Sequence, residues 1–282
     1  MKLASFALDG VSAFGAVEGE TVFDLSEGGA VAQAELLALG REALETALAA
    51  AKARGPGRAL ASVKLLPVVP RPGKIICLGR NYAEHAKEGG GEVLDYPAVF
   101  FRGPTSLVAA GDSLIRPSCS TAFDYEAELA FVIGRGGRHI AEAQALDHVA
   151  GYSCFNDGSV RDYQRRTPQW TMGKNFDGSG PFGPWLVTTD ALPPGASGLR
   201  IQTRLNGQTM QDGTTADMVF GVARTIAILS EVMTLEPGDV VATGTPAGVG
   251  YARKPPVWLK NGDVCEVEIE GIGVLRNPVR DE

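Results

Sequence analysis

Three carboxylates stand close together in one segment, DYEAELAFVIG, which spans residues 124–134. Glu126 and Glu128 are two residues apart, so on a β-strand their side chains point to the same side, roughly 7 Å apart. The residues that follow are apolar on both sides of this strand, which places the pair at the edge of a buried region. Two like charges there raise one pKa unless a cation neutralises them. Asp124 shares the face, so the strand alone does not decide which two of the three matter, and a solvated strand end is the simpler alternative.

A further carboxylate, Asp157, ends a second apolar segment, VAGYSCFND. Alone, an aspartate at this place is typical of a turn or a helix cap. If the two strands converge, three carboxylates from two strands form an all-oxygen site of the kind that Mg²⁺ or Mn²⁺ prefers. The chain has only three histidines, so any metal here is expected to be held mainly by oxygen.

His85 and Glu88 are three residues apart in a short predicted helix that follows LGRNY. At this spacing their side chains can meet, and a histidine oriented by a glutamate can take a proton from water near neutral pH. An incidental pair on a surface helix is the alternative. His139 and His148 flank another predicted helix in a charged stretch, and we interpret both as structural or exposed.

Two glycine-rich segments carry the remaining polar candidates. Lys174 lies in TMGKNFDGSGPFGPW, where a rigid loop could hold the lysine against an anionic substrate group, although a solvated lysine is the default. Thr245 lies in TGTPAGVG, whose backbone donors could line an anion pocket. Each signal is weak by itself.

The elements that must position these residues divide the chain near residue 68. The pattern of residues 1–68 predicts a small amino-terminal α+β unit with three short strands followed by one helix. The helix is expected over residues 31–54, where Leu37, Leu44 and Leu48 stand at helical spacing. The proline-rich stretch LLPVVPRPGK then excludes a central strand.

Residues 69–282 predict a strand-rich second domain. Asn206-Gly207 between alternating residues indicates a two-residue hairpin, and helices are expected near 141–149 and 218–233. We find no parallel strand–helix–strand rhythm, no dinucleotide fingerprint and no phosphate-binding loop. The fold class is therefore mostly β (α+β), with a rolled or sandwiched core.

Composition narrows the class of protein further. The 282 residues carry 26 basic and 33 acidic side chains, a net charge of −7, so nucleic acid and anionic membranes are poor candidate partners. No segment approaches the ~18 apolar residues of a membrane span, and the first residues do not resemble a signal peptide. Four dispersed cysteines are read as reduced thiols, and the expected location is cytoplasmic.

The ordered set of motifs resembles the fumarylacetoacetate hydrolase family. The matching segments run in family order from about residue 72 to 279: LGRNYAEHAKE, DYEAELAFVIG, GYSCFNDGSVRDYQ, GKNFDGSGPFGPW, LNGQTMQDGTTADMVF, LEPGDVVATGTPAGVG and NGDVCEVEIEGIGVLRNPV. The resemblance implies the family's mixed β-sandwich roll, preceded by a small amino-terminal domain that matches less closely. It also implies a homodimer or a larger even assembly, and a variable, lid-like loop at the glycine triplet after Glu88.

The resemblance also implies roles for individual residues. The family's metal ligands, its catalytic residues and its substrate-binding residues fall on nine positions here: Glu126, Glu128 and Asp157 for the metal, His85, Glu88 and Lys174 for catalysis, and Arg102, Gln164 and Thr245, with Lys174 again, for the substrate. The implied cofactor is Mg²⁺ or Mn²⁺.

The implied reaction is hydrolysis of a carbon–carbon bond in a 2,4-dioxo acid to pyruvate and a carboxylic acid. Candidate substrates are an acylpyruvate, fumarylpyruvate or a 2,4-dioxo-3-deoxy sugar acid. In this hypothesis His85, oriented by Glu88, activates the water, while the metal and Lys174 stabilise the departing enolate. The alternative is a decarboxylase or isomerase acting on a 2-oxo dicarboxylic acid through the same enolate. A binding protein without activity is disfavoured because all the candidate acid–base and metal positions are present.

Overall fold

Strands are the commoner regular element of the chain, and the computed structural model describes residues 1–8, 10–26, 32–90 and 92–282. One sheet contains β1 (Lys2–Leu8), β2 (Val11–Glu18), β3 (Thr21–Asp24), β4 (Arg58–Ala59), β5 (Lys64–Leu65), β6 (Ile75–Gly79), β7 (Ala98–Arg102), β8 (Leu107–Val108), β11 (Ala127–Ile133), β12 (Val149–Asn156), β14 (Gly180–Thr188) and β17 (Val240–Ala242). A second contains β9 (Leu114–Arg116), β15 (Arg200–Leu205), β16 (Gln208–Thr214), β18 (Val264–Ile269) and β19 (Gly273–Asp281). A two-stranded sheet pairs β10 (Phe123–Asp124) with β13 (Ser159–Val160).

Short helices connect these strands. The α-helices are α1 (Gln33–Ala38), α2 (Arg41–Arg54), α3 (Ala83–Glu88), α4 (Arg161–Gln164), α5 (Thr171–Lys174) and α6 (Val222–Val232). The 3₁₀ turns are η1 (Leu60–Ser62), η2 (Pro104–Ser106), η3 (Glu142–His148), η4 (Thr189–Ala191), η5 (Pro194–Ala196), η6 (Thr215–Asp217) and η7 (Gly250–Ala252). None of the described helices has the length and apolar character of a membrane span.

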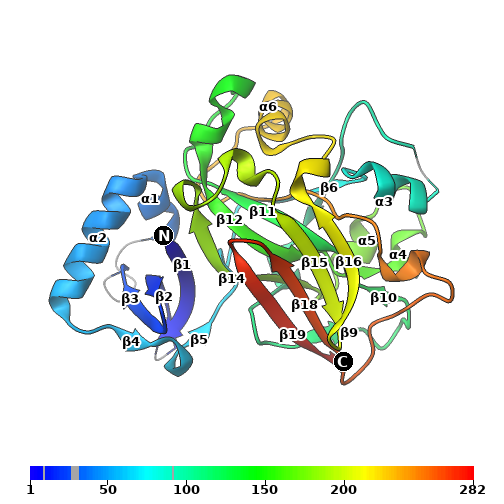
Figure 1. Cartoon of the computed structure of the whole chain (residues 1–282), viewed down its shortest axis with the longest axis horizontal. Helices are drawn as coiled ribbons and strands as arrows, with labels where there is room; N and C mark the ends of the chain where they lie inside the picture. Colours follow the sequence, from blue (N-terminus) through cyan, green and yellow to red (C-terminus); the bar gives the residue numbers. More distant parts are fainter. Residues whose placement is uncertain (9, 27–31, 91) are drawn as a thin grey trace.

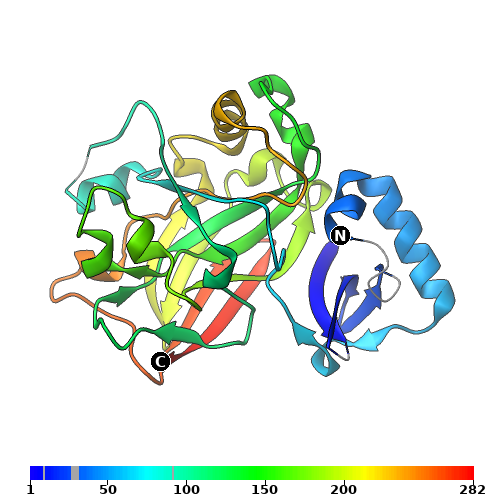
Figure 2. The ribbon, with the colours of Figure 1, turned by 180° about the vertical axis from the view of Figure 1, so that it is seen from behind.

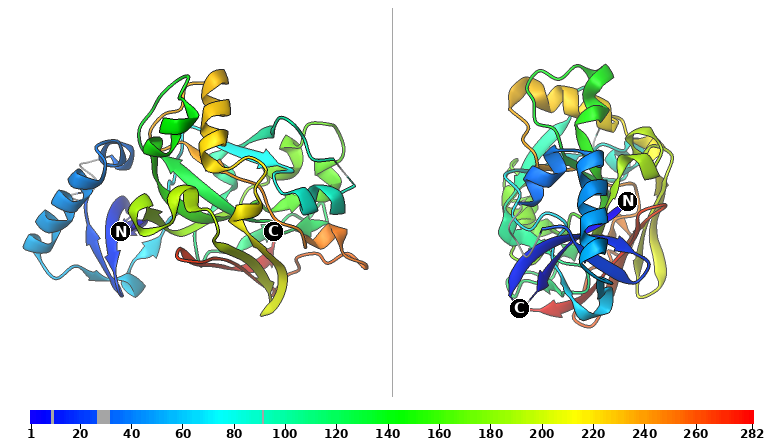
Figure 3. Two further views of the ribbon diagram at one scale, coloured as in Figure 1. Left: turned by 45° about the horizontal axis from the view of Figure 1, so that its top comes forward. Right: turned by 90° about the vertical axis from the view of Figure 1, so that its left-hand side faces the viewer.

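The two larger sheets pack face to face, as Figures 1 and 3 show. Along β11, Leu129 and Phe131 enter the core shared with Ile201 of β15 and Val267 of β18. Ala130, on the opposite side of the same strand, packs into a second core. A strand that is apolar on both faces lies between two layers. The predicted mostly-β, α+β fold with a sandwiched core is confirmed.

The amino-terminal segment joins the same sheet, because β1 pairs with β14 and the strand order runs β4-β3-β2-β1-β14-β12-β11-β17-β6-β7. Leu37, Leu44 and Leu48 are buried as predicted. The single helix expected over residues 31–54 is wrong for its described part, because the chain breaks into α1 and α2 at Gly40, whose φ of 79° lies in the left-handed region. Figure 3 shows α2 lying across the first strands. The domain boundary near residue 68 stays a prediction.

Strand β14 is the main element that the sequence did not predict. The segment GPFGPWLVT reads as a loop because it contains two prolines, yet it lies between β1 and β12. The pairing with β12 shifts register between Tyr152 and Cys154, so Pro184 falls where no regular ladder bond is needed. Proline is therefore tolerated at this irregularity inside the sheet.

Other local predictions are confirmed or corrected. The hairpin at Asn206-Gly207 joins β15 to β16, and both residues have positive φ, as its turn type requires. The helix expected near 141–149 is the 3₁₀ turn η3, and the one expected over 218–233 is the shorter α6. Gly91, the last residue of the glycine triplet at which the resemblance implies a variable, lid-like loop, lies outside the described residues. All four cysteines are free.

Short helices gather at one end of the molecule, remote from β1–β3. Figures 1 and 2 show α3, α4 and α5 on this side. Strand β11 is antiparallel to β12 and β17, and β17 runs parallel to β6. The start of β11 and the ends of β12, β17 and β6 therefore meet at this end, where each strand passes into a loop or a short helix. These ends carry the residues that the sequence singled out.

Candidate active site

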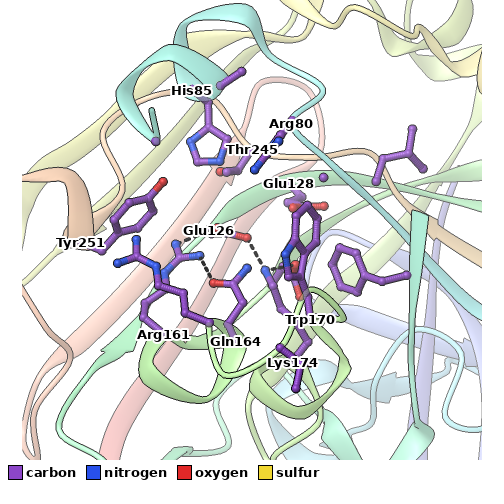
Figure 4. A pocket seen from close by; sticks show the side chains of 18 residues that line it. Arg80, His85, Glu126, Glu128, Arg161, Gln164, Trp170, Lys174, Thr245 and Tyr251 are labelled. Carbon is purple, nitrogen blue, oxygen red and sulfur yellow. Dashed lines mark hydrogen bonds and ion pairs between the residues drawn. The ribbon is translucent and has the colours of Figure 1, made fainter. Parts of the chain in front are cut away.

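The three predicted metal carboxylates come together because β11 and β12 pair in a fixed register. Ala127 lies opposite Asn156, so the residues flanking this pair, Glu126 and Asp157, are neighbours. The Asp157 amide donates to the Glu126 carbonyl over 2.9 Å. Carboxylate oxygens of Glu126, Glu128 and Asp157 lie within 4.8 Å of one another, and all three residues are buried. Figure 4 shows the two glutamates with Lys174 directed toward them.

Two of these carboxylates already have cationic partners. The Lys174 ammonium, buried at the end of α5, lies 2.6 Å from Glu126 Oε2 and also contacts Asp157 Oδ2. Burial opposes the charged form of this lysine, but Asp157 and Glu126 raise its pKa. Burial likewise opposes ionised Glu126, yet Arg161 and Lys174 lower the pKa of that carboxyl. Lys174 therefore stays protonated as a hydrogen-bond donor in the site.

Asp124, the third carboxylate of the strand segment, has a different task. It lies in β10, and its carboxylate accepts from the Arg161 Nε and from the backbone amides of Gly250 and Tyr251 over 2.8–3.0 Å. The Arg161 Nη2 lies 2.8 Å from Asp124 and 2.7 Å from Glu126, at angles that make these ion pairs rather than directed hydrogen bonds. Asp124 thus fixes Arg161 and stands outside the metal group.

Glu128 is the carboxylate without a cation. It is buried and accepts from the Gly244 amide over 2.8 Å, but the described residues form no ion pair with it. Burial raises its pKa well above the usual range, and repulsion from Asp157 and Glu126 adds to the rise.

The buried charges therefore leave a negative excess that fits a cation. Among the described residues around this site, four buried carboxylates (Asp124, Glu126, Glu128, Asp157) face three buried cations (Arg102, Arg161, Lys174). All three oxygen donors of the metal group are hard ligands, so they fit a divalent cation of the Mg²⁺ or Mn²⁺ kind.

His85 and Glu88 form the predicted pair on α3. His85 Nδ1 lies 3.1 Å from Glu88 Oε1, and both Glu88 oxygens accept from the Gly248 amide over 3.0 Å. A carboxylate oxygen accepts, so in the neutral imidazole Nδ1 carries the proton that Glu88 binds and Nε2 is the basic nitrogen. Gly248 can approach because its φ is 106° and a Cβ there would lie 2.4 Å from the Met210 carbonyl oxygen.

A cavity of about 290 Å³ connects His85 with the carboxylates. Of the remaining predicted residues, Gln164 and Thr245 line it, while Glu88 stands behind His85. Gln164 Oε1 accepts from Arg161 Nη1 over 3.0 Å, and Thr245 Oγ1 accepts from Gln211 Nε2 over 2.7 Å. His139 and His148 lie outside the cavity lining. His139 is exposed, and His148 is buried with Nδ1 2.7 Å from the Arg135 carbonyl oxygen.

Arg102 occupies a different place from the substrate-binding one that the resemblance implies. Its side chain is fully buried behind Asp157, outside the residues that line the cavity. The guanidinium donates to Asp157 Oδ1, to Ser179 Oγ over 2.7 Å and to Ser106 Oγ over 3.2 Å. This placement lets Arg102 position Asp157, a candidate metal ligand, and its contact with substrate stays a prediction.

The structure adds cavity residues that the sequence reasoning missed: Arg80, Arg161, Arg165, Trp170 and Tyr251. The spacing of Arg161 and Gln164 could have identified Arg161, because a helix brings side chains three residues apart together. The guanidinium carbons of Arg161 and Arg165 lie 4.4 and 4.6 Å from the centroid of the Tyr251 ring. No sequence spacing connects Tyr251 to α4.

Comparison with known proteins identifies the family. Residues 74–280 match the family model described as fumarylacetoacetate (FAA) hydrolase, C-terminal. The chain is 43% identical over 247 residues to oxaloacetate tautomerase fahd2, mitochondrial, of Xenopus laevis, covering 87% of this chain and 77% of that protein. It is similar to the solved fumarylacetoacetate hydrolase of Exiguobacterium antarcticum (TM-score 0.83, 39% identity, all of both chains). It also resembles maleylpyruvate hydrolase of Sphingobium sp. SYK-6, solved with manganese(II) and pyruvate (TM-score 0.83, 30% identity, 100% of this chain and 99% of that one). The chain belongs to the fumarylacetoacetate hydrolase family.

Proposed function

We propose that this protein is a divalent-metal-dependent enzyme that interconverts the keto and enol forms of a 2-oxo dicarboxylic acid of the oxaloacetate type. The observation that carries the proposal is the free Nε2 of His85 in the same cavity as three carboxylates and a protonated lysine. The 43% identity to an oxaloacetate tautomerase supports this choice of reaction.

Glu126, Glu128 and Asp157 would hold the cation. When bound, Mg²⁺ or Mn²⁺ supplies positive charge where the substrate's 2-oxo oxygen becomes negative. Lys174 donates a hydrogen bond to that developing charge, since Asp157 and Glu126 keep it protonated.

His85 moves the proton. In the keto-to-enol direction its Nε2 takes a proton from carbon 3, the electron pair of that C–H bond becomes the carbon–carbon double bond, and the π pair of the carbonyl moves onto the oxygen of carbon 2. The imidazolium then returns the proton to the neighbouring oxygen on carbon 2. Glu88 holds the ring by its Nδ1 proton and stabilises the imidazolium, while the Gly248 amide holds Glu88.

Hydrolysis, the first choice from the sequence, is the second candidate. The same His85 Nε2 could activate a water against a 2,4-dioxo acid, and the similarity to maleylpyruvate hydrolase favours keeping this reaction. The choice between Mg²⁺ and Mn²⁺, the even homo-oligomer and the cytoplasmic location stay predictions. The Xenopus relative is itself described as mitochondrial.

The test measures three reactions separately: keto–enol conversion of oxaloacetate by absorbance, its CO₂ release, and pyruvate formation from acylpyruvates. His85→Ala should lower keto–enol conversion about 10²–10⁴-fold, the usual contribution of a general base. His139→Asn is the matched control, because His139 is exposed and outside the cavity. Full conversion by His85→Ala, or by enzyme stripped with EDTA, would refute the proposal. Pyruvate formation from acylpyruvates without keto–enol conversion would favour the hydrolase.

A further inference from the structure

Arg80 stands at the mouth of the cavity in an unusual backbone conformation. It follows β6 directly, and its φ is 58°. Four described residues other than glycine have positive φ, namely Arg80, His139, Ala196 and Asn206, and Arg80 is the one that lines the cavity. A non-glycine residue in this region is strained, and such residues cluster where a side chain must be aimed.

An indole ring supports the Arg80 side chain. The guanidinium carbon lies 5.8 Å from the Trp170 ring centroid, and Trp170 itself packs edge-on against Phe100 at 5.6 Å. The preceding Gly79 makes room for this ring, because a Cβ there would lie 2.1 Å from Trp170 Cζ3. A strand-end glycine and a half-buried tryptophan therefore set the place of the arginine.

The charge of Arg80 is available to a ligand. The side chain is exposed, and within the described residues it forms no ion pair or hydrogen bond. The buried cations of the site differ, since Arg102, Arg161 and Lys174 are all bound to carboxylates. Arg80 thus brings an uncompensated positive charge to a cavity whose floor is negative.

We propose that Arg80 is a specificity-determining residue that binds the distal carboxylate of a dicarboxylic substrate. The inference rests on the proposed function, in which the 2-oxo acid half lies at the metal carboxylates and Lys174. In Figure 4 Arg80 and Lys174 approach these carboxylates from opposite sides of the view, with His85 on the side of Arg80. A guanidinium presents two parallel N–H donors to a carboxylate, so it selects substrates that end in one.

The test compares two C4 acids that differ only at the distal end, oxaloacetate and 2-oxobutanoate. Exchange of the carbon-3 protons for deuterium, followed by NMR, reports the same proton transfer in both. Arg80→Met should lower kcat/KM for oxaloacetate about 10–100-fold, the range expected when a hydrogen-bonded charge pair is lost. For 2-oxobutanoate the change in kcat/KM should stay within about threefold. The kcat/KM of Arg80→Lys for oxaloacetate should lie between those of Arg80→Met and the wild type, because an ammonium keeps the charge but lacks the two parallel N–H donors of a guanidinium.

Binding gives a second readout that needs no turnover. Calorimetry with Mg²⁺ present compares L-malate with lactate, a 2-hydroxy dicarboxylate with a 2-hydroxy monocarboxylate. Arg80→Met should weaken the binding of malate about 10–100-fold and leave the affinity for lactate unchanged. If the wild type exchanges neither oxo acid, the proposed function fails, while the malate-to-lactate ratio still tests Arg80.

Arg165 is the comparator, since it also lines the cavity and is exposed, but its guanidinium lies over Tyr251. Arg165→Met should alter the malate-to-lactate ratio less than Arg80→Met does. Equal losses for both acids in Arg80→Met, no loss for either, or a larger selective loss in Arg165→Met would each overturn the assignment. Thermal melting should show Arg80→Met as stable as the wild type.

Discussion

Replacing each of the two neighbouring glutamates by glutamine should have opposite effects on the metal-free protein. Glu126 interacts with Arg161 and Lys174, so Glu126→Gln leaves two buried cations with a neutral partner. Glu128 forms no ion pair with any described residue, so Glu128→Gln replaces a buried, unpaired carboxylate by a neutral amide of nearly the same shape. The amide oxygen of the new side chain can still accept from Gly244.

The size of each effect follows from these contacts. Breaking a buried ion pair by removing one partner costs about 3–5 kcal/mol. At roughly 2–4 °C per kcal/mol for a chain of this size, the lower bound of 3 kcal/mol lowers the Tm of Glu126→Gln by about 6–12 °C. Glu128→Gln should melt at or above the wild type, because neutralising an unpaired buried carboxylate removes its desolvation cost.

The pH dependence has a definite sign. The pKa of Glu128 is raised in the folded state, so this residue binds a proton more tightly there than in the unfolded chain. Its contribution to stability is present below the ordinary pKa of 4.5 and is lost as pH rises through the folded-state pKa. The melting advantage of Glu128→Gln over metal-free wild type should therefore widen above pH 4.5.

Differential scanning fluorimetry measures these effects in EDTA and then with Mg²⁺ or Mn²⁺. The wild type should gain about 2.7 kcal/mol at a metal concentration of 100 Kd, or roughly 5–11 °C. Both glutamine variants should lose most of this gain. A Glu128→Gln protein that melts well below metal-free wild type, or that keeps the full metal response, would refute the charge assignment.

Two further substitutions test how the site is supported. Asn81 is buried, and its amide donates to the carbonyls of Phe220 and Thr243 and accepts from the Phe220 amide over 2.7–3.0 Å. Asn81→Ala should therefore cost about 3 kcal/mol by leaving buried backbone groups unpaired, as urea denaturation can measure; a loss under 1 kcal/mol would contradict this. Gly79→Ala forces a Cβ against Trp170, so we expect about 1–3 kcal/mol of destabilisation by the same method and a change in tryptophan fluorescence. An unchanged emission spectrum would show that the ring had not moved.

The sequence could predict the carboxylate group because two strand patterns fix it. Apolar alternation defines the β11 segment, and once it pairs with β12 the flanking residues Glu126 and Asp157 must be neighbours. The role of Asp124 could not be predicted in the same way. Its ion pair with Arg161 spans 37 positions and depends on where β10 and α4 lie in space, which periodicity does not report.

Proline and glycine explain the local errors. Because of its prolines, the segment of β14 was predicted to be a loop. It forms a strand because a register shift against β12 tolerates Pro184, and such a shift cannot be recognised in a single sequence. At Gly40 the sequence predicted a continuous helix, whereas the structure has a break. A glycine within a helical pattern is tolerated or ends the helix, and the positive φ that decides the matter is a property of the folded chain.

The two ends of the cavity are under different physical constraints. At the floor, Asp157 is held in buried ion pairs with Lys174 and, behind the floor, with Arg102, and losing one partner of such a pair costs about 3–5 kcal/mol. At the mouth, Arg80 and Arg165 are exposed without ion pairs among the described residues, and changes at exposed positions of this kind usually stay within about 0.5 kcal/mol. Under the proposed function, substitution at the mouth can therefore alter which distal group binds while the carboxylates and Lys174 at the floor stay in place. Under the proposed function, this asymmetry would let similar proteins bear the names of a tautomerase and a hydrolase, with substrate choice made at the mouth.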